Sequence, residues 1–323
     1  MGNVLTDLLA ERDYLIADGG TGTNMMDRGL PPGRPPDMWN LDGQEHVTWL
    51  HESFIEAGAD IILTNTFGSN PCRLKLDKAE DKTAEINIAG AHLARAAADG
   101  AGRPVVVAGS VGPTGEMMEP FGTLTADAAE AAFYEQMSAL AEGGVDVIWI
   151  ETIFAFDELA AAIRAAHRTG LPVVSTMTFD TASRTMMGDT AEKAVDFTHT
   201  FEPRLAAFGA NCGAGPSMLI DTVVGLCEAA DEQDVIIAKG NCGIPQMIDG
   251  EIMYSGTNEI MAEYARLARD CGARIIGGCC GTTPERLGAI VEALDGYTPK
   301  SPPSQDAIVE ALGPIKVPPP GSV

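Results

Sequence analysis

The chain has 323 residues, of which 45 % are hydrophobic and 21 % are charged, and its formal net charge is -25. This length and composition suit a soluble globular protein that buries one large core or two small ones. The negative charge argues against nucleic acid as a partner, because a polyphosphate backbone requires clustered Lys and Arg, and equally against an anionic membrane surface.

The N-terminal residues and the cysteines indicate a cytoplasmic protein. Residues 1–12 are polar and helix-like, without the basic start and apolar run of a targeting segment. No stretch reaches the ~20 apolar residues that cross a bilayer. The seven cysteines are an odd number, which disfavours a disulfide framework in a chain without a secretion signal. We therefore expect reduced thiols, some of which bind a metal.

Apolar segments typical of buried strands alternate with amphipathic helical segments along the chain. In the first half they predict a strand at 14–18, a helix at 47–57, a strand at 60–66, a helix at 81–99, a strand at 105–110, a helix at 126–142, a strand at 146–151 and a helix at 157–168. In the second half they predict a strand at 172–179, a helix at 190–201, a strand at 205–211, a helix at 216–230, a strand at 235–239, a helix at 257–271, a strand from 274 and a helix at 284–294.

Eight strand-helix pairs predict a single (β/α)8 TIM barrel over residues 1–296. The strands are apolar on both faces, as is typical of a parallel sheet covered by helices. An open, doubly wound sheet is the alternative, but eight regular repeats favour closure.

A proline-rich tail follows at 297–323, with prolines at 299, 302, 303, 314, 318, 319 and 320. We expect this tail to be extended or disordered. A tail of this kind is suited to lie on a partner subunit of a homo-oligomer.

Polar residues cluster where the predicted strands end, which is where (β/α)8 barrels carry their catalytic groups. They are Asp18, Asn65, Thr66, Ser110, Glu151, Cys212, Lys239, Asn241, Cys279 and Cys280. If the strands are assigned correctly, the three cysteines among them converge on the C-terminal mouth of the barrel.

The pair Cys279-Cys280 is flanked by glycines at 277, 278 and 281, which permit the bend that brings two adjacent side chains to one point. Together with Cys212, the pair offers three thiolates. That set suits zinc and leaves the fourth tetrahedral position for water or substrate. A thiol substrate bound there would lose its proton near neutral pH. The alternative is that these cysteines are buried apolar residues or a redox pair, and Cys242 is a spare candidate for the fourth ligand.

Six motifs occur in a fixed order, namely DGGTGT at 18–23, TNTFGSN at 64–70, GPTG at 112–115, ET at 151–152, NC at 211–212 and GGCCGT at 277–282. In this ordered set the sequence resembles the homocysteine S-methyltransferase family. The family includes betaine-homocysteine methyltransferase and the N-terminal homocysteine domain of cobalamin-dependent methionine synthase. The resemblance runs from about Tyr14 to Leu294.

The resemblance implies a zinc enzyme that methylates homocysteine to methionine. By the same resemblance, Cys212, Cys279 and Cys280 are the zinc ligands. Asp18 and Glu151 are implied to bind the ammonium of homocysteine, which suits paired carboxylates. Helix capping or a structural ion pair is the alternative role for these two acids.

Other loop residues receive roles in the same way. Gly19, Gly20 and the loop around Thr66 are implied to complete the amino-acid pocket. Lys239 follows a predicted strand and is a candidate Schiff-base amine in a lyase, although a structural partner for an acid is the preferred interpretation.

The methyl donor is less well defined by the sequence. Trp39 lies close to the position of a tryptophan that lines the betaine pocket in the betaine enzymes, and an aromatic face attracts a quaternary ammonium. Its alternative role is to pack a loop onto the barrel rim. Gly68 stands where the betaine enzymes have a tyrosine, and in this loop the chain looks more like the methionine synthase domain. No folate or corrinoid domain follows Leu294, so a corrinoid would have to arrive on a separate protein.

We therefore expect a zinc-dependent homocysteine S-methyltransferase whose donor is betaine or a related onium compound. The first alternative is the homocysteine-activating module of a split methionine synthase that takes its methyl group from a corrinoid protein. The second is a Schiff-base lyase that uses Lys239.

Overall fold

The computed structural model describes residues 3–180, 182–248 and 251–315. Its main sheet has eight parallel strands: β1 (Leu15–Ile16), β2 (Ile61–Leu63), β3 (Val106–Val111), β4 (Val147–Ile153), β5 (Val173–Met177), β6 (Ala207–Cys212), β7 (Ile236–Gly240) and β10 (Ile275–Gly278). They are ordered β1-β10-β7-β6-β5-β4-β3-β2. A parallel bridge between Ala17 and Ile61 joins the two outer strands, as does a 2.7 Å hydrogen bond from the Asp60 amide to the Ile16 carbonyl. The predicted (β/α)8 barrel is therefore confirmed, and the open sheet is wrong.

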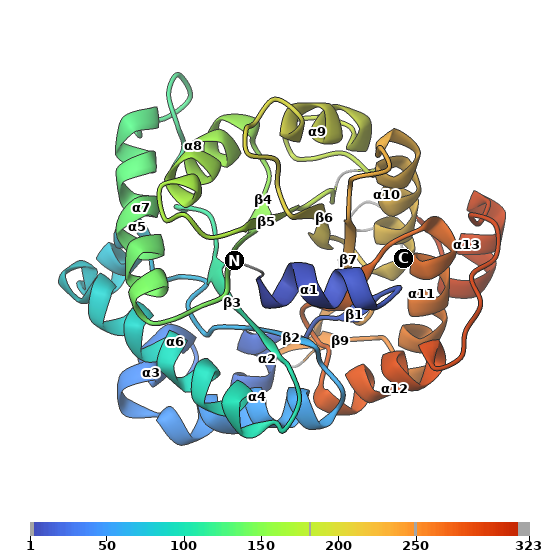
Figure 1. Ribbon diagram of the computed structural model, residues 1–323, viewed down its shortest axis with the longest axis horizontal. Helices are drawn as coiled ribbons and strands as arrows, with labels where there is room; N and C mark the ends of the chain where they lie inside the picture. Colours follow the sequence, from blue (N-terminus) through green and yellow to red (C-terminus); the bar gives the residue numbers. More distant parts are fainter. Residues whose placement is uncertain (1–2, 181, 249–250, 316–323) are drawn as a thin grey trace.

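Helices surround this barrel close to the predicted positions (Figure 1). They are α4 (Gln44–Glu56), α6 (Thr83–Gly100), α7 (Ala126–Glu142), α8 (Phe156–His167), α9 (Ala191–Thr198), α10 (Pro216–Ala229), α11 (Asn258–Cys271) and α12 (Pro284–Leu294). In α7, α9, α11 and α12 the residue before the helix is a threonine whose hydroxyl accepts a backbone hydrogen bond from the first turn. These caps explain why the helix starts could be read from the sequence.

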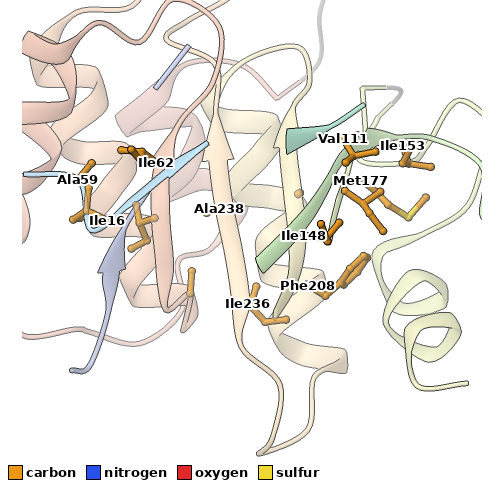
Figure 2. Packing of buried hydrophobic residues seen from close by; sticks show 14 of the residues in the cluster. Ile16, Ala59, Ile62, Val111, Ile148, Ile153, Met177, Phe208, Ile236 and Ala238 are labelled. Atoms are coloured by element: carbon orange, nitrogen blue, oxygen red, sulfur yellow. The ribbon is translucent and has the colours of Figure 1, made fainter. Parts of the chain in front are cut away.

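The barrel has two hydrophobic layers because side chains on a strand alternate between its faces. Outward-facing residues such as Ile16, Ile62 and Ile148 pack against the helices (Figure 2). Inward-facing residues such as Trp149 and Ile237 fill the barrel interior. The barrel strands are therefore apolar on both faces, because one face packs against the helices and the other fills the interior.

The N-terminal helix α1 (Val4–Glu11) closes one end of the barrel. Figure 1 shows it lying across the middle of the ring of strands. Its buried leucines, Leu5, Leu8 and Leu9, belong to the same hydrophobic cluster as the barrel interior. Since this helix precedes β1, it covers the end at which the strands begin and leaves their C-terminal ends open.

Shorter elements lie in the loops after the strands. They are α2 (Thr21–Asp27), the 3-10 turn η1 (Pro36–Met38), α3 (Trp39–Asp42), α5 (Pro71–Leu74), the 3-10 turns η2 (Lys75–Asp77) and η3 (Glu80–Lys82), and an antiparallel hairpin of β8 (Pro245–Ile248) and β9 (Glu251–Tyr254). These elements were not predicted, because each is shorter than the periodic patterns used to find the barrel units.

The expectation of an extended or disordered tail is wrong for part of that segment. Residues Gln305–Leu312 form helix α13, capped by the Ser304 hydroxyl. Figure 1 shows α13 outside α10 and α11, and Ile308 on it is 1 % exposed within the main core. The helix forms because the prolines flank it and leave its interior free of them. Residues 316–323, with the last three prolines, lie outside the described residues.

Among the described residues, none of the helices combines the length and the apolar character that a membrane crossing requires.

His51 on α4 generates a prediction about stability and pH. Its side chain is buried, neither ring nitrogen has a hydrogen-bond partner among the described residues, and burial lowers its pKa from 6.5 to about 4. The unfolded chain therefore binds a proton on His51 that the folded chain rejects, so stability is lost as pH falls from about 6.5 towards 4. We expect protonation of His51 alone to lower the free energy of unfolding by roughly 3 kcal/mol between these two pH values.

Urea unfolding at pH 7 and pH 4 measures this loss. The His51→Phe variant should lose less stability between the two pH values than the unmodified protein, by the amount assigned to His51. His92→Gln, at an exposed position on α6, serves as a control and should behave as the unmodified protein does. Equal losses in the unmodified protein and His51→Phe would contradict the prediction.

Candidate active site

The C-terminal ends of the strands open into a cavity of about 1230 Å³. Its wall takes residues from seven of the eight barrel strands or the loops after them. Of the predicted site residues, those on the wall are Gly19, Gly20, Thr66, Glu151, Cys212, Cys279 and Cys280. Asp18 and Trp39 are not on it.

The three cysteines of the predicted metal site lie together at the base of this mouth. Their sulfur atoms are all within 4.8 Å of one another, and each residue is half-buried. Cys212 is the last residue of β6 and has a φ of 64°, a left-handed conformation that is uncommon outside glycine. Cys279 and Cys280 follow β10 and precede Gly281, which also has a positive φ of 75°. The glycine-flanked bend inferred from the sequence therefore exists.

Hydrogen bonds from the neighbouring strand ends hold the cysteine pair. The Cys279 amide donates to the Gly240 carbonyl at 2.8 Å. The Cys280 amide donates to the Asn241 side-chain oxygen at 3.0 Å, and the Asn241 side-chain nitrogen donates to the Gly213 carbonyl at 2.7 Å. Asn241 thus connects the loops that carry all three sulfurs.

The donor set fits a tetrahedral thiophilic metal. Three sulfurs bound to one zinc at ~2.3 Å lie about 3.8 Å apart, which is compatible with the observed cluster. The contacts of Cys212 with Cys279 and Cys280 raise the pKa of Cys212, and the hydrogen bond from Cys212 lowers the pKa of Cys280 to about 3. Cys242 is fully buried, with its sulfur close to Gly256, and does not belong to the cluster.

A buried charged group lies beside the cysteines. The Lys239 ammonium donates to Asp18 Oδ1 at 2.6 Å, and both side chains are 3 % exposed or less. The other carboxylate oxygen of Asp18 accepts the Leu63 amide at 2.7 Å. Burial raises the pKa of Asp18. Burial also lowers the pKa of Lys239, but the nearby carboxylates of Asp18 and Glu151 outweigh it and the pKa is raised.

Glu151 is the carboxyl group of this cluster that faces the cavity. It accepts a hydrogen bond from the Ser110 hydroxyl at 2.5 Å. Burial raises its pKa to about 7. A carboxyl group in this position can exchange its proton near neutral pH or gain a cationic partner.

Gly19 and Gly20 allow the first loop to press against the cysteine loop. A Cβ on Gly19 would lie 2.5 Å from the Thr282 carbonyl oxygen, and one on Gly20 would lie 2.7 Å from the Cys279 carbonyl oxygen. The Gly20 amide also donates to the Thr282 carbonyl at 3.1 Å. A side chain at either position would therefore push the two loops apart.

Thr66 and Trp39 have mainly structural contacts. The Thr66 hydroxyl donates to the Ser110 carbonyl at 2.8 Å, which joins the loop after β2 to strand β3. Trp39, on α3, is 6 % exposed and stacks on His46 with ring centroids 4.3 Å apart. The aromatic residues that do line the cavity are Phe67 and Tyr254.

Tyr254 was missed in the sequence because the hairpin that carries it was missed. Its ring packs onto Gly281, where a Cβ would lie 2.4 Å from the ring. The sequence has an Asp-Gly dipeptide at 249–250, preceded by Met247-Ile248 and followed by Glu251-Ile252-Met253, and such a dipeptide between largely apolar segments is a typical hairpin signal.

The Asp18–Lys239 pair generates a prediction about stability. Replacing Lys239 by Met leaves a buried carboxylate without its cation, which we expect to cost about 3–5 kcal/mol of unfolding free energy. The double variant Asp18→Asn, Lys239→Met should recover part of that loss. Lys193→Met, which removes an exposed i,i+4 pair with Asp189, is the control and should cost less than about 0.5 kcal/mol. Urea denaturation tests the prediction, and a loss below about 1 kcal/mol in Lys239→Met would disprove it.

Comparisons with known proteins show which solved structures share this fold and which family the sequence matches. The Escherichia coli homocysteine methyltransferase MmuM has a similar structure in its oxidized form, with a TM-score of 0.75 and 23 % sequence identity over 90 % of this chain and 99 % of that one. Its metallated form gives a TM-score of 0.74 at 23 % identity over 89 % and 99 % of the two chains. At this identity the likeness shows a shared fold. The profile of the family described as homocysteine S-methyltransferase matches residues 15–294, and the chain therefore belongs to the homocysteine S-methyltransferase family.

Proposed function

We propose that this protein is a zinc-dependent enzyme that transfers a methyl group from an onium compound such as betaine to homocysteine, which yields methionine. The observation that carries the proposal is the meeting of three sulfurs, Glu151 and Lys239 on one cavity wall. Family membership supports the methyltransferase activity and the thiol substrate. The bonding of Lys239 to Asp18 favours this reaction over a Schiff-base lyase, which needs a free amine.

Cys212, Cys279 and Cys280 would hold the zinc ion. When bound, zinc supplies a positive charge that favours the thiolate form of a thiol substrate at neutral pH. The chain's own part is to hold its three sulfurs in place through Asn241 and Gly240. No side-chain general base is then required for the thiol proton.

In this proposal Glu151 binds the ammonium of homocysteine directly. It lines the cavity and is held by Ser110, and a cationic partner favours its ionised form. Asp18 is proposed to act less directly, because its oxygens are engaged by Lys239 and the Leu63 amide. Gly19, Gly20 and Thr66 shape the wall around the amino-acid end.

The methyl group is proposed to move in a single displacement. The sulfur of homocysteine forms a bond to the methyl carbon while the bond from that carbon to the onium nitrogen or sulfur breaks, and the donor leaves as a neutral amine or sulfide. Holding the two substrates in line is the main task of the protein in such a reaction. Tyr254 lines the cavity and would offer its ring to the cationic donor, whereas Trp39 would act through the packing of α3.

Exposed apolar side chains around the mouth support the alternative in which a methylcorrinoid protein is the donor. Among the described residues, eight large hydrophobic side chains are exposed. Seven of them lie in segments that follow the C-terminal ends of barrel strands, which is the side of the mouth. They are Met26, Leu76, Met117, Phe121, Met186, Met187 and Met253. An apolar rim around an active site is suited to docking another protein, such as one that carries a corrinoid.

Replacement of Cys279 by Ser tests the metal site. With one thiolate missing, we expect the zinc content to fall well below about one ion per chain and methionine formation to fall by more than about 100-fold. The matched control is Cys227→Ser, since Cys227 is half-buried on α10 and outside the cluster. Unchanged zinc content and activity in Cys279→Ser would show that the zinc assignment is wrong.

A donor comparison tests the reaction. Zinc-loaded protein with homocysteine is given betaine in one sample and methylcobalamin in another, and methionine is measured. We expect turnover with betaine alone, because the cavity is large enough for a second small molecule. Turnover only with methylcobalamin would reject an onium donor. It would instead support the homocysteine-activating module of a split methionine synthase.

A further inference from the structure

A buried side chain between the sulfurs and Glu151 has no assigned role. Asn211 is the residue before Cys212 on β6, and its side chain is fully buried. Its side-chain oxygen accepts the Thr152 amide at 2.9 Å, and its side-chain nitrogen donates to the Thr152 hydroxyl at 2.7 Å. The same nitrogen donates to the Cys279 sulfur at 3.8 Å. One amide group thus contacts both the residue after Glu151 and a proposed metal ligand.

These contacts fix the orientation of the Asn211 amide. The Thr152 backbone N–H can only donate, so it requires the side-chain oxygen of Asn211 on its side. The side-chain nitrogen then directs one hydrogen to the Thr152 hydroxyl and the other to the Cys279 sulfur. Both donors of the amide are therefore used, and one of them serves sulfur. A thiolate accepts such a bond more strongly than a neutral thiol does, because it is charged.

Asn211 joins strands that are not neighbours in the sheet. β5 separates β6 from β4, and β7 separates β6 from β10. The bonds from Asn211 to Thr152 and Cys279 therefore run in both directions along the C-terminal edge of the sheet, past the strands in between. A single side chain thus links the end of β4, which carries Glu151, to the loop that carries Cys279.

The end of β4 departs from regular strand geometry at the residues that Asn211 holds. The pairing of β4 with β5 advances three residues on β4, from Ile150 to Ile153, but only two on β5. Such a bulge redirects side chains, and bulges are common beside active sites. Glu151 and Thr152 both line the cavity, although successive residues of a regular strand point to opposite faces. The bulge is therefore what places both residues on the wall.

Thr152 has a strained backbone that its bonds to Asn211 offset. Its φ is 64°, in the left-handed region that a β-branched residue rarely adopts. A conformation of this kind persists only where the surrounding structure holds it. Asn211 bonds both the amide and the hydroxyl of Thr152, and the Thr152 amide belongs to the peptide that follows Glu151. The bulge that turns Glu151 into the cavity is therefore held from β6.

We propose that Asn211 is a positioning residue that sets the amino-acid site and the metal site together. Its bonds to Thr152 hold the bulge that presents Glu151 to the ammonium of homocysteine, and its remaining N–H stabilises negative charge on the Cys279 sulfur. The inference rests on the function proposed above and adds a residue to it. Loss of this side chain weakens binding of the amino acid and of the metal at once, because hydrogen-bond partners of metal ligands contribute to metal affinity.

The first measurement uses cobalt(II) in place of zinc, because the sulfur-to-cobalt charge-transfer band reports the electron density on the thiolates. In Asn211→Ala we expect this band to move to longer wavelength, since a thiolate without the N–H bond gives up an electron more easily. The affinity for zinc, measured by competition with a chelator, should fall about 10- to 100-fold. Asn211→Ser has a side chain too short to bridge both partners but leaves a smaller cavity, and it should change both quantities in the same direction.

The second measurement follows the binding of 2-aminobutyrate, which has the amino-acid end of homocysteine without the sulfur, to zinc-loaded protein by NMR titration. We expect its Kd to rise about 10-fold in Asn211→Ala. Asn211→Asp keeps an oxygen for the Thr152 amide but has no N–H for the sulfur. It should therefore bind 2-aminobutyrate within about threefold of the unmodified protein and still show the shifted cobalt band. Asn87→Ala removes a buried amide bonded to the Ser69 and Thr83 carbonyls, and this control should lower only the melting temperature.

Three results would overturn the inference. A lower melting temperature in Asn211→Ala, with an unchanged cobalt band and unchanged affinities, would show that Asn211 only supports the strand ends. A change at one of the two sites without the other would remove the coupling between them. Equal losses of 2-aminobutyrate binding in Asn211→Asp and Asn211→Ala would show that the bond to the Thr152 amide does not hold Glu151. If the unmodified protein bound neither zinc nor homocysteine, the proposed function itself would fail and the inference with it, and this outcome is recognised without any variant.

Discussion

The hydrogen bonds that tie the loops after β6, β7 and β10 together determine where the three sulfurs lie. Thiolates repel one another, and nothing in their own chemistry brings them within 4.8 Å. The backbone bond from Cys279 to Gly240 and the two bonds of Asn241 supply that proximity. They exist because β10, β7 and β6 are neighbours in the sheet and their C-terminal ends lie at one edge. The metal site that we propose therefore depends on the adjacency of these three parallel strands, and Cys212 is itself paired with Gly240 at the end of β6.

A second constraint is the burial of charge beside those sulfurs. Lys239 is paired with Asp18 and lies near Glu151, so the ammonium offsets negative charge that would otherwise be costly at this depth. Without it, the carboxyl groups of Asp18 and Glu151 would lie beside three sulfurs in one low-dielectric region with no buried side-chain cation to offset their charge. Lys239 thus makes an acidic, sulfur-rich pocket tolerable in a protein whose net charge is already -25.

The barrel and the meeting of the cysteines could be predicted from the sequence because both follow from regular patterns. Strands buried on two faces have long apolar runs, and threonine caps mark helix starts. Features that depend on single contacts could not be predicted. The stacking of Trp39 on His46 and the docking of Ile308 in α13 arise from packing between separate segments. The prediction that Lys239 partners an acid is confirmed, and the structure identifies that acid as Asp18. The hairpin that carries Tyr254 was indicated only by a turn dipeptide, which periodicity does not detect.

Closure of one barrel end by α1 has a kinetic consequence. Leu5, Leu8 and Leu9 fill the end where the strands begin, so both reactants and both products of a two-substrate reaction must pass through the same opening. For the function that we propose, the thiol substrate and the methyl donor would enter at the C-terminal mouth, and both products would leave there. The helix before the first strand thus restricts traffic through the site, although it lies at the opposite end of the barrel from the sulfurs.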